Sequence, residues 1–141
     1  PLLAVWRSLF FKEGPLAPVA GQNSEWNRGR YLAEAVAHCE ECHTPRNIFG
    51  GLERSHAYAG NPHGPDGQGT PDITSDQKDG IGKWKLEEII DLLKTGSTLD
   101  GDIVGKGMAD VVDGTSRLTD ADLRALAVYI QSLPPQPQTP K

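Results

Sequence analysis

The feature that most constrains this chain is the pentapeptide Cys-Glu-Glu-Cys-His at residues 39–43. Cys39 and Cys42 are the only two cysteines among 141 residues. Two cysteines separated by two residues fit a redox disulfide, half of a zinc site or a covalent haem attachment. His43 favours the last of these, because a histidine directly after the second cysteine can reach the iron of a haem held by two thioether bonds.

The two alternative uses of the cysteine pair lack the partners that they need. A structural zinc site requires about two further cysteine or histidine ligands. The chain has no second cysteine pair, and His38, His56 and His63 are scattered. A thioredoxin-like disulfide requires a surrounding strand-helix-strand pattern, which the sequence does not show.

The composition predicts a small core surrounded by long loops. Hydrophobic residues make up 37% of the chain, and 16 glycines and 11 prolines interrupt regular structure. A net charge of -5 without any basic run argues against binding to nucleic acid or to an anionic membrane surface. The apolar residues 1–11 are too few to span a bilayer, which takes about 20.

Turn residues divide the chain into three predicted parts. Residues 1–22 are expected to be a linker segment that follows a short apolar stretch. Residues 23–135 are expected to form the domain, and residues 136–141 a mobile polar tail after two consecutive prolines. Since the chain starts at Pro1 with no signal-peptide pattern, we expect a mature protein, a processed fragment or an excised domain.

Helical periodicity predicts three helices and no strand-rich region. The helices cover about 25–38, 86–95 and 119–133, where apolar residues recur every three or four positions. Ser24 is the expected cap of the first helix, and Gly96 is placed to stop the second. The glycine-rich stretches between the helices, especially 60–82, are too irregular for long elements and are expected to wrap around something.

The haem iron needs a ligand on each face, and the sequence offers candidates for both. His43 is the expected proximal ligand, and its other ring nitrogen should donate to a backbone carbonyl. The only methionine, Met108, lies in a glycine-rich stretch that we expect to be a loop, which favours ligation over core packing. The competing distal ligands are His63 and, less strongly, His56, while His38 is too close to the motif to reach around the haem.

Three further residues are candidates for holding the haem. The guanidinium of Arg46 or the indole N–H of Trp84 can bind a haem propionate. A solvated arginine and a tryptophan that only covers the haem edge are the simpler alternatives. Pro45 is placed to stiffen the turn after the motif, although an ordinary loop proline explains it equally well.

These features together resemble class I cytochrome c. The resemblance covers about residues 24–133 and implies an all-α fold, with helices packed around one covalently bound haem c and long Gly/Pro-rich loops. More narrowly, the segments 25–32, 42–47, 70–74 and 79–84 are similar to the cytochrome subunits of membrane-associated bacterial alcohol, aldehyde and gluconate dehydrogenases.

The resemblance also implies a function, a location and partners. Such subunits commonly carry three haem domains that pass electrons from a flavin or pyrroloquinoline quinone dehydrogenase to ubiquinone. Residues 1–15 are similar to the segments that join successive domains, so an excised relay domain without substrate catalysis is expected, with the dehydrogenase and neighbouring haem domains as redox partners. Haem attachment by this motif takes place outside the cytoplasmic membrane, so a periplasmic or periplasm-facing location is expected.

Two alternatives to the relay remain open at this point. A free-standing periplasmic electron shuttle would use the same haem and the same ligands. A haem sensor or enzyme would need an open or displaceable distal position, whereas a His/Met pair fills both axial positions. No Ser/His/Asp or paired-carboxylate constellation can be assigned to a catalytic role.

Overall fold

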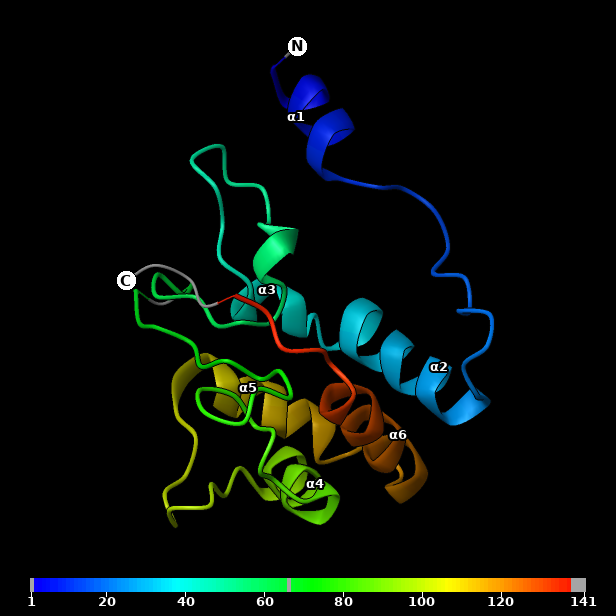
Figure 1. Cartoon of the computed structure of the whole chain (residues 1–141), viewed down its shortest axis with the longest axis vertical. Helices are drawn as coiled ribbons and strands as arrows, with labels where there is room; N and C mark the ends of the chain where they lie inside the picture. The colour runs from blue at the N-terminus through cyan, green and yellow to red at the C-terminus, as the bar shows by residue number, and fades with distance from the viewer. Residues whose placement is uncertain (1, 66, 138–141) are drawn as a thin grey trace.

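The computed structural model describes residues 2–65 and 67–137, and in that part of the chain the regular secondary structure is helical, apart from three isolated β-bridges. The predicted all-α class is confirmed (Figure 1). The elements in chain order are α1 (Leu2–Phe10), α2 (Ser24–Tyr31), the π-helical turn η1 (Leu32–Val36), α3 (Cys39–His43), the 3-10 turn η2 (Arg54–His56), α4 (Leu86–Thr95), α5 (Lys106–Thr115) and α6 (Asp120–Gln131).

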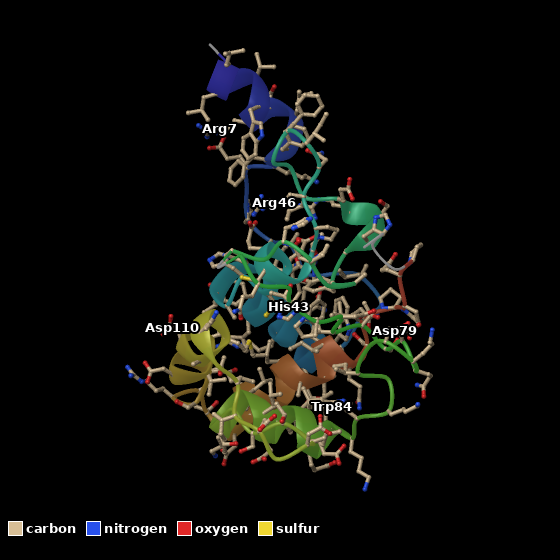
Figure 2. All side chains as sticks on the ribbon, turned by 90° about the vertical axis from the view of Figure 1, so that its left-hand side faces the viewer. Arg7, His43, Arg46, Asp79, Trp84 and Asp110 are labelled. Atoms are coloured by element: carbon tan, nitrogen blue, oxygen red, sulfur yellow. The ribbon has the colours of Figure 1, made fainter. Side chains whose placement is uncertain are left out.

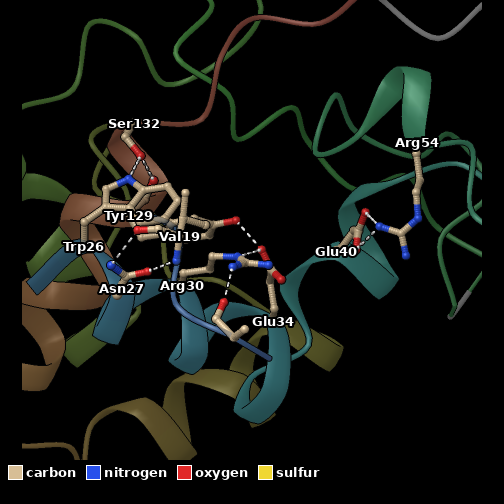
Figure 3. Close-up of polar contacts among 10 residues, drawn as sticks. Val19, Trp26, Asn27, Arg30, Glu34, Glu40, Arg54, Tyr129 and Ser132 are labelled. Atoms are coloured by element: carbon tan, nitrogen blue, oxygen red, sulfur yellow. Dashed lines mark hydrogen bonds and ion pairs between the residues drawn. The ribbon is translucent and has the colours of Figure 1, made fainter. Parts of the chain in front are cut away.

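Helices α2 and α6 cross at Gly29, which permits close backbone contact. A Cβ at this position would overlap the carbonyl oxygen of Ala125 and lie 2.8 Å from the Cβ of Tyr129. Beside the crossing, the Trp26 and Tyr129 rings meet edge to face with their centroids 5.0 Å apart. The indole N–H of Trp26 donates to Ser132 Oγ at 2.7 Å (Figure 3). The crossing therefore fixes the first helix of the domain against the last.

The three predicted helices are confirmed, with adjusted ends. Helix α4 has the predicted bounds, and Gly96 ends it in the left-handed region at φ 79°. Thr119 caps α6 by accepting from the third residue of the helix. The cap of α2 is Asn23 rather than Ser24, because the Asn23 side chain accepts the Trp26 N–H at 2.8 Å. An asparagine directly before a helix can accept this amide N–H, so the cap lies one residue before the predicted position.

Helix α5 was not predicted from the sequence, and Met108 was expected in a loop. In the structure α5 begins at Lys106, so Met108 lies in its first turn. Two glycines, Gly105 and Gly107, hid the periodicity, because glycine is a poor helix former. The residues that share the inward face at helical spacing are Met108, Val111, Val112 and Thr115.

Helix α1 was also missed, and it lies apart from the other helices at the far end of the molecule (Figure 1). It contacts the hairpin over residues 46–52, where the Trp6 indole N–H donates to the carbonyl of Phe49 at 2.7 Å. Phe10 packs so closely on Gly51 that a Cβ there would overlap its ring. No residue of α1 is buried.

The segment between α1 and α2 is extended but tied down. The side chain of Asn27 accepts the Val19 N–H at 2.7 Å (Figure 3). It also donates to the Gln22 carbonyl at 3.2 Å. Arg30 donates to the Ala17 carbonyl at 3.0 Å. The predicted boundaries at 22 and 135 stay predictions, and residues 138–141 of the predicted tail lie outside the described residues. Within the described part, no helix has the length and apolarity that a membrane span requires.

Candidate haem-binding site

A cavity of about 720 Å³ lies among helices α3 to α6 and the loop before α4. Its size falls in the range of about 300–1,000 Å³ that is typical of cofactor sites. Cys39, Cys42 and His43 line it from α3, and Met108 lines it from α5. Most of the remaining lining is apolar and includes Ile73, Ile81, Trp84, Ile89, Leu92, Leu93, Val104, Val111, Leu126 and Ile130. An apolar cavity that gathers both cysteines, the histidine and the methionine fits a covalently bound haem.

His43 is buried and oriented by a backbone carbonyl. Its side chain Nδ1 lies 2.8 Å from the carbonyl oxygen of Pro71, and the residue is only 8% exposed. Since a carbonyl oxygen only accepts, Nδ1 carries the proton, and Nε2 of the neutral ring keeps its lone pair for a metal. Burial lowers the pKa of His43, although the Pro71 hydrogen bond and the Asp72 charge act against this shift. The expected carbonyl partner of the histidine is therefore present.

The segment over residues 70–74, which we call the proximal strap, holds the motif in place. Thr70 Oγ1 donates to the Cys42 carbonyl at 2.6 Å, one residue before the histidine. The Ile73 amide donates to the Tyr58 carbonyl at 3.0 Å. Tyr58 is in turn tied to the motif, because its amide donates to Thr44 Oγ1 at 2.9 Å. The strap lies in the 60–82 stretch that was expected to wrap around something, and residues 68–73 and 79–81 do line the cavity.

The two cysteines are the first and fourth residues of the short helix α3. Residues three apart share one face of a helix, so Cys39 and Cys42 both reach the cavity. His38, directly before them, takes a left-handed conformation with φ 52° and turns the chain from η1 into α3. Burial raises the pKa of the Cys39 thiol to about 11, so this sulfur stays protonated at neutral pH.

Of the distal candidates, only Met108 lines the cavity. Its side chain is partly buried and packs against the core. His63 is exposed in the loop, where its amide donates to Asn61 Oδ1 at 2.9 Å. His56 lies in η2 with its Nδ1 3.8 Å from a Glu53 carboxylate oxygen. Neither histidine is among the lining residues.

The three secondary candidates have different surroundings. Trp84 lines the cavity. Arg46 does not, since its exposed guanidinium pairs with Glu41 and donates to the Gly50 carbonyl at 2.8 Å. In the view of Figure 2, Arg46 and Trp84 lie on opposite sides of His43. Their propionate roles stay predictions.

Pro45 is buried directly beyond the motif, and its carbonyl accepts the Glu53 amide at 2.9 Å. It therefore lies at the base of the hairpin that α1 contacts, and it is not one of the residues that line the cavity. Its stiffening role after His43 also stays a prediction.

Two residues of the proximal strap have site contacts that the sequence analysis did not assign. Pro71 contributes a backbone carbonyl, which carries no side-chain signal in a sequence. Asp72 is a buried carboxylate that lines the cavity. An aspartate in a stretch rich in glycine, proline and aspartate is typical of a turn, so only the structure distinguishes it. Among the described residues, no cluster of three or more His, Cys, Asp or Glu is placed to hold a metal ion.

Comparison with known proteins gives the family. The Cytochrome c family model matches residues 62–134, just over half of the chain. The chain therefore belongs to the cytochrome c family, in which a haem c is bound covalently and the protein transfers electrons rather than converting a substrate.

The curated relatives are longer cytochromes. A diheme cytochrome c-type protein of Cereibacter sphaeroides is 43% identical over 139 residues, which cover 94% of this chain and 43% of that protein. The fructose dehydrogenase cytochrome subunit of Gluconobacter japonicus is 37% identical over 94% of this chain and 27% of the subunit. The gluconate 2-dehydrogenase cytochrome c subunit of Pantoea cypripedii is 34% identical over 93% of this chain and 31% of the subunit. The chain spans less than half the length of each of these relatives.

Proposed function

We propose that this chain is a one-electron relay that carries one haem c with His43 and Met108 as its axial ligands. The observation that carries the proposal is the shared cavity. The attachment motif on α3 and the only methionine of the chain, on α5, line the same apolar space. The competing histidines, His56 and His63, lie outside it.

Each residue of the site has a separate task in this proposal. Cys39 and Cys42 anchor the haem through thioether bonds, and the Pro71 carbonyl holds the His43 ring so that Nε2 is the ligating atom. The thioether of Met108 would supply the second protein ligand of the iron. When bound, the haem supplies a reversible one-electron iron couple, whose potential the axial ligands and the surrounding polarity adjust. The apolar lining excludes water and so limits reorganisation around the site.

The saturated iron is the reason that transfer is favoured over catalysis. With a nitrogen and a sulfur ligand in place, no coordination position is left for oxygen or for a substrate. A haem sensor or enzyme would need Met108 to leave. Binding of carbon monoxide to the reduced protein at neutral pH would support that alternative and contradict the relay.

We further propose that the relay works at the periplasmic face of a bacterial membrane, between a flavin or quinoprotein dehydrogenase and a neighbouring haem domain or terminal acceptor. The names of the relatives support this, since two of those described above are cytochrome subunits of sugar-acid or sugar dehydrogenases. The chain matches only part of each, as a single relay domain would. A free-standing shuttle would be favoured if the encoded protein held no further Cys-x-x-Cys-His motif.

The ligation is tested by optical spectroscopy of the purified haem protein. Ferric haem with a sulfur ligand from methionine has a weak near-infrared charge-transfer band, which we expect in the parent and not in Met108→Ala. Val111→Ala is the matched control, because Val111 lines the cavity from the same helix. A parent without the band, or a band that survives in Met108→Ala, would contradict the proposal.

A further inference from the structure

Asp72 places a carboxylate in the wall of the haem-binding cavity. It is 6% exposed and lines the cavity beside the residues of the motif. It directly follows Pro71, whose carbonyl accepts the hydrogen bond from His43 Nδ1. Burying a carboxylate is costly unless the surrounding structure compensates for its lost hydration. The position of this side chain therefore calls for an explanation beyond packing.

A hydrogen bond and close backbone packing help to fix the carboxylate. Asp72 Oδ1 accepts the amide N–H of the fully buried Thr74 at 2.7 Å. On its other side, a Cβ at Gly80 would lie 3.0 Å from the same oxygen, so the loop backbone packs directly against it. The charge is thus held at one place relative to the strap, whereas a surface aspartate would be free to move with solvent.

The carboxylate of Asp72 and the ring of His43 line the same cavity. Asp72 directly follows Pro71, whose carbonyl accepts the hydrogen bond from His43 Nδ1, so the buried charge belongs to the segment that holds the ring. The field of this carboxylate favours any positive charge on the ring or on a metal bound to it. Oxidised and reduced haem differ by one positive charge, and in a poorly hydrated cavity a nearby charge is weakly screened. A negative group here therefore stabilises the oxidised state more than the reduced state.

We propose that Asp72 is an electrostatic positioning residue that lowers the reduction potential of the haem by acting through His43. This inference rests on the proposed ligation by His43 and assigns to the proximal strap a second task besides holding the motif. It makes the strap, rather than the distal ligand alone, a determinant of which donors and acceptors the relay can serve.

The two other charged residues that line the cavity provide the comparison. Asp79 is exposed on the loop before α4, with its Oδ2 3.8 Å from Lys78 Nζ. Lys106 is exposed at the start of α5. Solvent and salt screen both of these groups far more than Asp72. Asp79→Asn is therefore a matched control, because it removes one negative charge from the lining of the same cavity, but at an exposed position.

The test is a spectroelectrochemical titration of the complete haem-loaded protein. Asp72→Asn keeps an oxygen to accept the Thr74 amide and removes only the charge. We expect it to shift the oxidation equilibrium toward the reduced state by about tenfold, which is about 59 mV for a one-electron couple. Asp79→Asn should shift it by less than about threefold, or about 30 mV on the same scale. Asp72→Glu, which keeps the charge, should stay near the parent.

The inference is overturned if the reduction potential of Asp72→Asn equals that of Asp79→Asn, or if it is lower than that of the parent. If Asp72→Asn does not take up haem, Asp72→Glu and Asp72→Gln provide an equivalent pair that differs only in charge, and an unchanged potential between them overturns it as well. The near-infrared band of each variant separates this inference from the proposed function. A parent without that band contradicts ligation by Met108, whereas the potential of the Asp72 variants still decides whether the strap charge acts on the iron.

Discussion

The two ligand-bearing sides of the cavity are built in different ways. On the His43 side, the proximal strap bonds to the residues around the motif, and the helices behind it cross at a glycine with no room for a side chain. On the Met108 side, α5 begins without a side-chain cap, and its first residue, Lys106, takes a left-handed φ of 53°. Several long-range contacts thus determine the proximal geometry, while the distal geometry depends on how one short helix packs.

The largest effect should come from adding a methyl group on the His43 side. Gly29→Ala places a Cβ against the Ala125 carbonyl and near the Tyr129 Cβ, where backbone rather than flexible side chain is in the way. We expect the free energy of unfolding to fall by about 3 kcal/mol, as in severe overpacking of a core. Urea denaturation followed by circular dichroism measures it. A loss below 1 kcal/mol would mean that the crossing is not rigid.

A smaller loss should follow from removing a strap hydrogen bond. Thr70→Val deletes the donor to the Cys42 carbonyl, and we expect a loss of about 1.5 kcal/mol in the free energy of unfolding. The matched control is Thr98→Val on the Met108 side, where Thr98 Oγ1 donates to the Asp102 carbonyl at 3.1 Å in a partly exposed loop. Equal losses in the free energy of unfolding of the two variants would contradict the difference between the His43 side and the Met108 side.

On the Met108 side, adding a methyl group should stabilise the protein. Gly114 lies in α5 with nothing within 4 Å of the position of a Cβ. Gly114→Ala is therefore expected to raise the free energy of unfolding by about 0.8 kcal/mol, the difference in helix propensity between the two residues. The same urea titration as for Gly29→Ala measures it, and a loss would show that α5 is more tightly packed than its surroundings indicate.

The smallest effect is expected where α5 begins. Lys106 has a left-handed backbone conformation, which is strained for a residue with a side chain, and Lys106→Gly removes that strain. The substitution also raises the conformational entropy of the unfolded chain, which offsets part of the gain. The net gain should be about 0.5 kcal/mol. Lys85→Gly before α4, where φ is -76°, is the control and should not stabilise. A destabilised Lys106→Gly would show that the lysine side chain contributes contacts that outweigh its backbone strain.

The sequence predicted the His43 side better than the Met108 side, for a physical reason. The motif and the carbonyl partner of His43 depend on a strong local signal and on obligatory ligand chemistry. Helix α4 with its Gly96 stop, which packs on α5, was also predicted from local periodicity. Helix α5 was missed because Gly105 and Gly107 are poor helix formers and tertiary packing, not propensity, makes the segment helical. The sequence could not identify Pro71 as the acceptor of the His43 hydrogen bond, since every residue has the same backbone carbonyl.

The crossing of α2 with α6 also constrains the order in which the protein can be assembled. The ion pair between Arg28 and Asp122 joins residues 94 positions apart, so the fold closes only when nearly the whole chain is present. Contacts between such distant segments form late, since the entropy of a long loop must be overcome first. During synthesis, Cys39 and Cys42 therefore emerge well before the last helix can pack over them. On the proposed haem attachment, that interval leaves both cysteines accessible, and the packing of α6 then covers them.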